Sequence, residues 1–306
     1  MTIKPMGLMQ WLILMLLSLL WGGSFFFMKF AVLELPVLSI VLIRVSLAAL
    51  FLGAYLFFSG VKLPLKWQCW RLFFFLGLFN NVVPFSLLIF GMSEIASGLA
   101  AILNATTPVF TILVAHFYTS DEKITTHKMI GVLLGLAGVT VLVVGDSLNT
   151  DQSLLAIFAC LGAALSYAIA AMIGRQFAAL KMAPSAIAMG QVSASSALLI
   201  PLVLLFDKPW QLTMPSIGTV YALLALGILS TALAYVLFFK LIASAGATNA
   251  VLVTLLVPVS AIALGILFLN EALKTQHLLG MALIALGLLA IDGRLLQRFS
   301  VRRGLI

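Results

Sequence analysis

The sequence predicts an all-α integral membrane protein, with ten transmembrane helices arranged as two inverted five-helix repeats. Three observations predict this fold class. Of the 306 residues, 63% are apolar and 8% are charged, whereas a soluble domain carries about 25% charged residues. The apolar residues form ten long runs, and a pattern of proline, glutamate and glycine in the first half returns in the second. The composition therefore excludes most classes of soluble protein.

The ten segments follow from the length that a membrane helix needs. About 20 apolar residues cross roughly 30 Å of hydrocarbon, and charges and turn formers mark where each run stops. We expect the segments at 8–30, 36–58, 72–92, 97–117, 128–145, 153–174, 185–206, 216–239, 247–269 and 276–293. The first is longer than the apolar region of a signal peptide and has no small-residue cleavage site, so we interpret it as a membrane helix. The connections are too short for a soluble domain, which leaves the helices and these loops to carry the function.

The positions of Lys and Arg predict how the chain lies in the membrane. In short loops these cations favour the cytoplasmic side. Thirteen of the 17 lie on one side of the predicted bundle, three lie on the other, and Arg44 falls within the second segment. Both termini are therefore expected in the cytoplasm. The net charge of +8 is spread singly between apolar runs, which does not form the basic surface that nucleic acid requires. This distribution of positive charge is compatible with contact with anionic lipid headgroups.

The sequence offers no set of residues for catalysis or for a cofactor. Cys69 falls in a predicted connection and Cys160 in an apolar run, so neither a disulfide framework nor a metal-binding knuckle is expected. The three histidines are scattered near helix ends, and the chain contains no G-x-x-x-x-G-K-[ST] loop. We therefore expect no enzyme activity, no metal and no cofactor, and ATP is not expected to drive the protein directly.

Two units of similar pattern divide the chain near residue 150. The series Pro, Glu, Gly, Gly occurs with spacings of 14, 9, 7 and again of 13, 9, 7, first at Pro108, Glu122, Gly131 and Gly138 and then at Pro258, Glu271, Gly280 and Gly287. At an offset of 150, Gly77 and Phe85 meet Gly227 and Tyr235; at an offset of 146, Trp21 and Lys29 meet Tyr167 and Arg175. We expect a first repeat at 1–149 and a second at 150–306.

Each unit has five helices, an odd number, so the second must enter the membrane from the opposite face. Many transporters use inverted repeats, bind substrate near the midplane between the halves, and rock one half against the other for alternating access. Channels use such repeats too, so the pattern favours a transporter without excluding a channel. Five glycines are interpreted as sites of close helix packing: Gly131, Gly135, Gly138, Gly280 and Gly287.

Several of these residues together resemble a known family. The motif Leu20-Trp21-Gly22-Gly23-Ser24-Phe25, the following Lys29, Arg44 behind Pro36, and the duplicated Pro, Glu, Gly, Gly series are similar to the EamA family of the drug/metabolite transporter superfamily. The resemblance covers nearly the whole chain. It implies a central cavity between the halves, peripheral fifth and tenth helices, a bacterial inner membrane location, and export of small metabolites, with amino acids and their toxic analogues as the best represented cargo. Gln191 or Val192 stands opposite Arg44, so that arginine is not duplicated.

Uncharged polar residues gather at the predicted midplane. They lie near the midpoints of the third, fourth, eighth and ninth segments and comprise Asn80, Asn81, Asn104, Thr107, Ser230, Thr231 and Thr254. Unpaired polar groups in hydrocarbon cost several kcal/mol, so a bundle with a purely structural role avoids them. On the fourth segment, Asn104, Thr107, Pro108 and Thr111 share one helical face, which we expect to line the cavity.

Proline gives a second signal at the same depth. Pro84, Pro108 and Pro258 each remove the hydrogen bond to the carbonyl four residues earlier, and in each case that carbonyl belongs to a polar midplane residue. The freed carbonyl and its side chain would suit an ammonium or hydroxyl group. The alternative is a kink whose polar neighbours only repair the backbone.

Aromatic residues and one arginine complete the expected binding site. Trp21, Tyr167 and Tyr235 lie mid-span, where interfacial anchoring does not explain them. Arg44 is costly in hydrocarbon, so we expect it to face the bundle interior, a water-filled cavity or a partner carboxylate. The candidate substrate-binding residues are Trp21, Ser24, Arg44, Asn80, Asn81, Asn104, Thr107, Tyr167, Ser230, Thr231, Tyr235 and Thr254.

The other charged residues have competing interpretations. Lys29 either snorkels to the outer interface or contacts substrate, and Glu122 and Glu271 are expected to cap loops or to form interfacial hydrogen bonds. No Asp or Glu falls at a predicted midplane. A carboxylate-bearing or zwitterionic cargo therefore fits Arg44 better than a polycation does, and a simple carboxylate proton relay is disfavoured.

These observations predict a secondary transporter that exports small metabolites, with amino acids or their analogues as the first expectation. Sugar-phosphate, nucleotide-sugar and multidrug exporters of the same fold are the alternatives. Phosphate would need several cations in the cavity, and only Arg44, with Lys29 or Arg175, is available. The expected partners are a small-molecule substrate and the lipid bilayer, and a monomer is compatible with the sequence.

Overall fold

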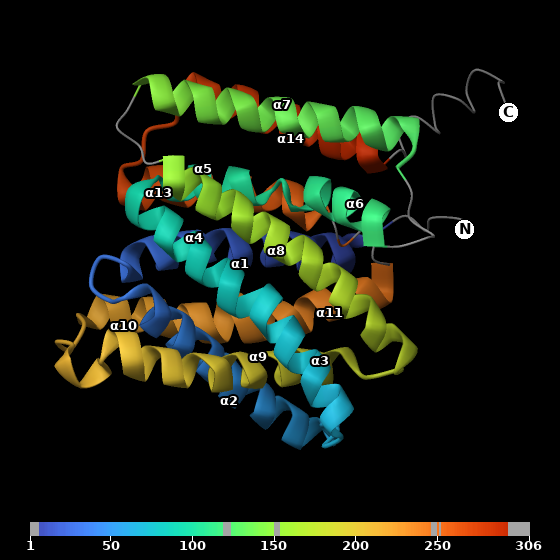
Figure 1. Ribbon diagram of the computed structural model, residues 1–306, viewed down its shortest axis with the longest axis vertical. Helices are drawn as coiled ribbons and strands as arrows, with labels where there is room; N and C mark the ends of the chain where they lie inside the picture. The colour runs from blue at the N-terminus through green and yellow to red at the C-terminus, as the bar shows by residue number, and fades with distance from the viewer. Residues whose placement is uncertain (1–5, 119–123, 150–153, 246–249, 251, 293–306) are drawn as a thin grey trace, which may run out of the picture.

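The computed structural model describes residues 6–118, 124–149, 154–245, 250 and 252–292, and within these ranges the regular elements are all helical (Figure 1). Seven helical stretches of the described residues are long and apolar enough to cross a membrane. Three shorter apolar helices, Lys128–Leu142, Leu256–Leu269 and Thr275–Ala290, complete the set. The predicted fold class is confirmed, and we number the ten spans in chain order. Glu122 lies outside the described residues.

Spans 1 to 5 form the first repeat. Their elements are α1 (Leu8–Ala31), α2 (Val37–Ser59), α3 (Trp67–Gly77), η1 (Leu78–Val82), α4 (Val83–Glu94), α5 (Ser97–Asn104), α6 (Thr107–Tyr118) and α7 (Thr126–Asn149). Span 3 is the continuous series α3, η1, α4, and span 4 is the pair α5, α6.

Spans 6 to 10 form the second repeat. Their elements are α8 (Leu154–Ala179), α9 (Pro184–Leu202), η2 (Val203–Asp207), the 3₁₀ turn η3 (Pro209–Gln211), α10 (Ile217–Leu224), η4 (Ala225–Leu233), α11 (Ala234–Ala245), α13 (Val253–Leu269) and α14 (Thr275–Asp292). Span 7 joins α9 to η2, and span 8 is the series α10, η4, α11.

Two predictions about local structure were wrong. Span 3 begins at Trp67, five residues before the predicted start, because Arg71 lies on the exposed side of the first turns and does not interrupt the helix. Cys69 is consequently a buried helical residue and not part of a connection. Span 4 is interrupted at Ala105 and Thr106, directly before Pro108, which lacks the N–H that a continuous helix needs at that point.

Spans 3 and 8 both widen into a π-helix at their midpoints. The segment η1 carries Asn80 and Asn81, and η4 carries Ser230 and Thr231 at an offset of 150. Such segments leave backbone carbonyls without the usual helical partner and are frequent at functional sites. The Ser166 hydroxyl donates to the Phe79 carbonyl (2.7 Å), and the Thr231 hydroxyl donates to that of Leu226 (2.8 Å).

Helices α7 and α14 form an antiparallel pair at one edge of the bundle, as expected for peripheral fifth and tenth spans (Figure 1). A Cβ atom on Gly138 would lie 2.8 Å from the Gly280 carbonyl oxygen, and one on Gly287 would lie 2.6 Å from that of Gly131. The backbones approach so closely that a larger side chain at these positions would force them apart. The interpretation of these glycines as packing sites is therefore confirmed.

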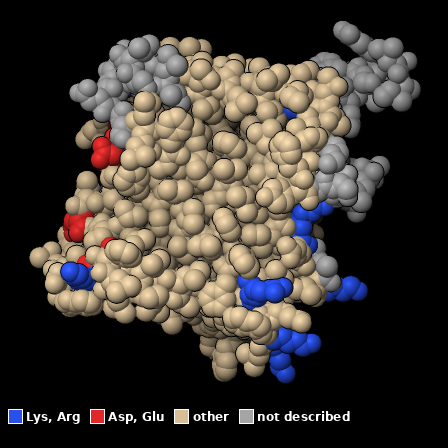
Figure 2. Space-filling model, in the orientation of Figure 1, with Lys and Arg blue, Asp and Glu red and all other residues tan. Residues whose placement is uncertain are grey.

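Charged side chains gather at the two ends of the spans (Figure 2). We call one end the cation end; its described Lys and Arg residues are Lys62, Lys66, Arg71, Lys128, Arg175, Lys181 and Lys240. The opposite end, here the carboxylate end, carries Glu34, Glu94, Asp207 and Glu271 together with Lys29, Lys208 and Lys274. The core between them is apolar, apart from a polar cluster at mid-span.

Candidate functional site

Arg44 lies at the centre of the bundle with 3% of its surface exposed. Its Nε donates to the Thr231 hydroxyl at 2.9 Å, and one terminal nitrogen lies 3.2 Å from the Met28 sulfur. The guanidinium carbon stands 3.7 Å from the centre of the Phe85 ring, in cation–π geometry. In the described part of the chain no carboxylate contacts Arg44. A buried cation with only neutral and weakly polar partners is costly.

A second polar group forms around Gln191, which is also 3% exposed. The Asn80 amide donates to the Gln191 side-chain oxygen (2.9 Å) and to the Tyr235 hydroxyl (3.4 Å), which in turn donates to Asn81 Oδ1 (3.0 Å). Asn81 donates to the Ser195 hydroxyl at 3.0 Å. These bonds join spans 3, 7 and 8 in one chain across the repeats.

The two groups occupy equivalent places in the repeats. Gly227 packs on the backbone of Arg44, where a Cβ would lie 3.1 Å from the carbonyl oxygen, and Gly77 packs on that of Gln191 at 2.7 Å. Gly77 and Gly227 are repeat partners, so Gln191, and not Val192, is the structural counterpart of Arg44. We call the Arg44 group the arginine pole and the Gln191 group the amide pole.

Two tyrosines, Tyr167 and Tyr235, lie near Arg44. Both side chains are half-buried, and Tyr235 also bonds Asn80 and Asn81 of the amide pole. Together the poles hold Arg44, Asn80, Asn81, Tyr167, Thr231 and Tyr235, which are six of the twelve predicted residues.

Five of the other predicted residues pack or bond elsewhere, or are partly unpaired. Trp21 packs against Phe238 with ring centroids 5.2 Å apart, and Ser24 donates to the Trp21 carbonyl at 2.8 Å. Ser230 is 1% exposed and Asn104 is half-buried; Ser230 Oγ and Asn104 Oδ1 are buried without a hydrogen-bond partner. Thr254 is half-buried in α13.

A turn interrupts the predicted stripe on span 4. Helix α5 ends at Asn104 and α6 begins at Thr107, and Asn104, Thr107, Pro108 and Thr111 are each half-buried. The Thr107 hydroxyl donates to the Asn104 carbonyl at 2.7 Å, so the carbonyl that Pro108 frees is already occupied. At this proline the backbone is repaired locally, and the Asn104 side chain is what remains for a ligand.

Comparison with known proteins identifies the family of this chain. The model of the EamA-like transporter family matches the chain twice, at residues 9–144 and 154–291.

The chain belongs to the EamA-like transporter family.

Relatives within the family extend over nearly the full chain. The uncharacterized transporter YoaV of Bacillus subtilis is 29% identical over 279 residues, covering 89% of this chain and 92% of its own. A probable amino-acid metabolite efflux pump of Escherichia coli K12 is 27% identical over 90% of this chain and 91% of its own. A protein of known crystal structure, 21% identical, superposes with a TM-score of 0.67 over 94% of this chain and 96% of its own, and shares the fold. The chain is thus a multi-pass membrane protein of a transporter family.

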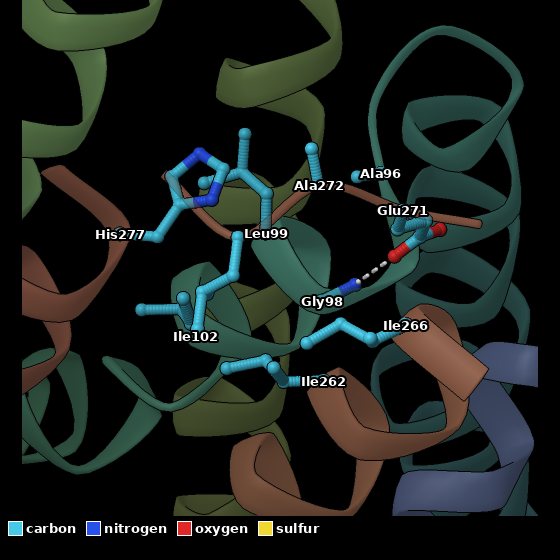
Figure 3. A pocket seen from close by; sticks show the side chains of 10 residues that line it. Ala96, Gly98, Leu99, Ile102, Ile262, Ile266, Glu271, Ala272 and His277 are labelled. Atoms are coloured by element: carbon cyan, nitrogen blue, oxygen red, sulfur yellow. Dashed lines mark hydrogen bonds between the residues drawn. The ribbon is translucent and has the colours of Figure 1, made fainter. Parts of the chain in front are cut away.

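This EamA-like chain also links its repeats at the carboxylate end. Glu271 accepts from the Ser97 backbone N–H (2.7 Å) and hydroxyl (2.9 Å) and from the Gly98 N–H (3.1 Å), at the start of α5 (Figure 3). A small apolar hollow lies beside it. The carboxylate therefore caps a helix N-terminus, as expected, and complements its dipole.

Two further carboxylates act in the same way. Glu34 accepts from the Ser216 N–H and hydroxyl, both at 2.6 Å, and Asp207 accepts from the Ser39 N–H and hydroxyl, both at 2.7 Å. In all three cases the carboxylate and the serine belong to opposite repeats. The two bonds from Ser216 lower the pKa of Glu34 below its usual value.

Lys29 has a structural role that neither prediction described. Its ammonium donates to the carbonyls of Met92 (2.6 Å) and Ile95 (3.1 Å) at the end of α4. Glu271 caps the beginning of α5 just beyond, so the two residues secure opposite sides of the turn between spans 3 and 4. Lys29 is thus engaged at the carboxylate end and away from the poles.

Sequence reasoning missed four members of the poles. Gln191, Ser195, Met28 and Phe85 were not predicted as site residues, although Gln191 stands opposite Arg44 and Phe85 opposite Tyr235 in the repeat. The available signal was therefore the repeat alignment itself. Met28 could not be identified in this way, because an apolar side chain is expected at any position of a membrane helix.

Proposed function

We propose that this protein is a secondary transporter that exports amino acids or similar carboxylate-bearing metabolites across a bacterial cytoplasmic membrane by alternating access. The observation that carries the proposal is Arg44, buried at mid-span among neutral partners and bonded across the repeat boundary to Thr231. A cargo carboxylate is the natural partner for an uncompensated guanidinium. The amino-acid metabolite efflux pump among the relatives supports the same class of cargo.

The hydrogen bonds between the repeats are the contacts that change in such a transport cycle. The bonds Arg44–Thr231, Asn80–Gln191 and Asn81–Ser195 each join one repeat to the other. Rocking of the halves stretches these bonds, and cargo that binds between the poles replaces them with its own. The exchange offsets the cost of separating polar groups in a low-dielectric interior.

The membrane orientation is part of the proposal. The cation end faces the cytoplasm by the positive-inside rule, so the termini are cytoplasmic and the carboxylate end faces outward. The three capped carboxylates then hold the outward side closed. Scanning cysteine accessibility at Lys62 and Lys208, in intact cells and in inverted vesicles, tests this assignment; labelling of Lys208→Cys from the cytoplasmic side alone would reverse it.

Counterflow in proteoliposomes tests the function. Vesicles loaded with a mixed pool of amino acids, quaternary amines and sugar phosphates are diluted into each labelled compound in turn, with empty vesicles as the control. We expect accumulation of labelled amino acids or related carboxylates. Accumulation of quaternary amines or sugar phosphates alone would refute the proposed cargo class, and Arg44→Gln, which removes the cation, must abolish any carboxylate signal.

A further inference from the structure

The two poles are alike in position and differ in charge. Arg44 on α2 bonds Thr231 in the π-helical segment of span 8, and Gln191 on α9 bonds Asn80 in the π-helical segment of span 3. At each pole a glycine packs against the backbone of the central residue: Gly227 against Arg44, and Gly77 against Gln191. The repeat therefore supplies two equivalent sites, of which one holds a permanent positive charge and the other a neutral amide.

The aromatic residues at the two poles also differ, and each suits the polar residues beside it. Phe85 and Tyr235 are equivalent in the repeat. Phe85 presents its ring face to the guanidinium of Arg44, whereas the Tyr235 hydroxyl accepts from Asn80 and donates to Asn81. A ring face suits a cation, and a hydroxyl suits an amide. The asymmetry thus extends beyond one residue to the surroundings of each pole.

We propose that the pair Arg44 and Gln191 sets the charge of the cargo, so that one anionic group binds at the arginine pole and a second anionic group is excluded from the amide pole. The inference rests on the proposed function and narrows its substrate class. Neutral zwitterionic amino acids and monocarboxylates belong to that class, and acidic amino acids and phosphate esters do not.

Charge balance in a buried site supports this limit. One guanidinium neutralises one carboxylate, and a second anion in a low-dielectric interior needs a second cation. The described residues of the amide pole are the amides Asn80, Asn81 and Gln191, with the hydroxyls of Ser195 and Tyr235. Lys29 is bound to the end of α4 and does not supply that charge.

Glutamine and glutamate form a matched pair of cargo for the test, because they have nearly the same shape and differ by one anionic group. Their preference is measured as competition with the best transported compound in counterflow, and as thermal stabilisation of the purified protein. The wild type should prefer glutamine. Gln191→Arg should shift the ratio toward glutamate by at least about tenfold, about 1.4 kcal/mol. Gln191→Glu should shift it the other way and admit lysine, and Gln191→Met, similar in size and uncharged, should leave it unchanged.

The opposite shifts from one position distinguish specificity from general damage. The exchanged variant, Arg44→Gln with Gln191→Arg, should regain the binding and transport of glutamine that Arg44→Gln alone loses. An unchanged ratio in Gln191→Arg and Gln191→Glu would overturn the inference, as would a wild type that prefers glutamate. If neither variant folds, as judged by size-exclusion chromatography, the wild-type ratio decides. Absence of counterflow with every carboxylate refutes the proposed function instead, and the thermal shifts then still report the charge preference.

Discussion

The centre and the carboxylate end of this protein both join the two repeats by hydrogen bonds, but they do so with opposite chemistry. At the centre, the cation Arg44 bonds a threonine hydroxyl, and a separate group of amides bonds one another and nearby hydroxyls. At the carboxylate end, three anions receive backbone and hydroxyl donors at the starts of helices.

The difference indicates that the two regions have different roles. Charge-assisted bonds at helix starts hold two bodies in register and need no further partner. Among the residues that the structure describes, Arg44 has no partner of opposite charge at the centre, and Asn104 Oδ1 and Ser230 Oγ have no hydrogen-bond partner. A region that is incomplete by itself is suited to binding a ligand, whereas a region with all its bonds made is suited to holding a conformation.

The largest effect is expected at the arginine pole. Arg44→Lys keeps the charge but not the planar fork, and Arg44→Ala removes both. Transport should fall by roughly 30-fold or more in Arg44→Ala, because a buried charge-assisted contact is worth about 2 kcal/mol or more, and less in Arg44→Lys. The rate of counterflow measures it. A folded Arg44→Ala protein with normal transport would remove Arg44 from the site, and loss of folded protein in both variants would make its role structural.

A smaller loss is expected from the unpaired amide on span 4. Asn104→Leu removes a buried oxygen that has no partner, so thermal stability should stay the same or rise, while transport should fall about tenfold if cargo donates to that oxygen. Thr107→Val is the matched control, because the Thr107 hydroxyl serves only the local carbonyl in the observed contacts. Equal transport in Asn104→Leu and the wild type would contradict this assignment.

At the carboxylate end the expected change is in stability. Glu271→Ala removes three bonds to the start of α5 and should cost about 1 kcal/mol, as for the loss of other N-terminal caps. Differential scanning fluorimetry of purified protein measures the shift in Tm, with the exposed Glu94→Ala as control. Counterflow at a temperature well below Tm should persist. Abolished transport in a stable Glu271→Ala protein would place this carboxylate in the cargo pathway. The carboxylate end would then not have a purely structural role.

The smallest effect concerns the pH dependence of Glu34. Its pKa is lowered by the bonds from Ser216, so the contact stabilises the fold fully above the usual glutamate pKa of 4.5 and weakens as pH falls below that value through the lowered folded pKa. Glu34→Gln, which cannot ionise, should therefore flatten the stability profile below about pH 4.5, with slightly lower stability than the wild type at neutral pH and the same stability in acid. Hydrogen exchange at the start of α10 across this range reads the contact directly; a wild-type profile in Glu34→Gln would contradict it.

Much of the fold was predictable because membrane helices are defined by length and polarity. The ten spans and the repeat follow from apolar runs and from residues such as Gly77 and Gly227. The break in span 4 and the π-helical segments were not predictable, since they depend on hydroxyls such as Ser166 that reach freed carbonyls from another helix. For the site, polarity at mid-span identified Arg44, Asn80 and Tyr235. The same rule also selected Asn104 and Thr107, and the turn between them was not predicted.

The glycine contacts between α7 and α14 have a meaning for how the chain arose. Gly138 meets the backbone at Gly280 as Gly287 meets it at Gly131, which is the self-complementary geometry of an isologous dimer. A five-helix chain carrying one such helix would pair with an upside-down copy of itself, and both copies would then carry the same residue at every position. Joining the copies in one polypeptide keeps the dimer contact and frees the two halves to diverge. In the fused chain an arginine in one half can therefore correspond to a glutamine at the equivalent position of the other.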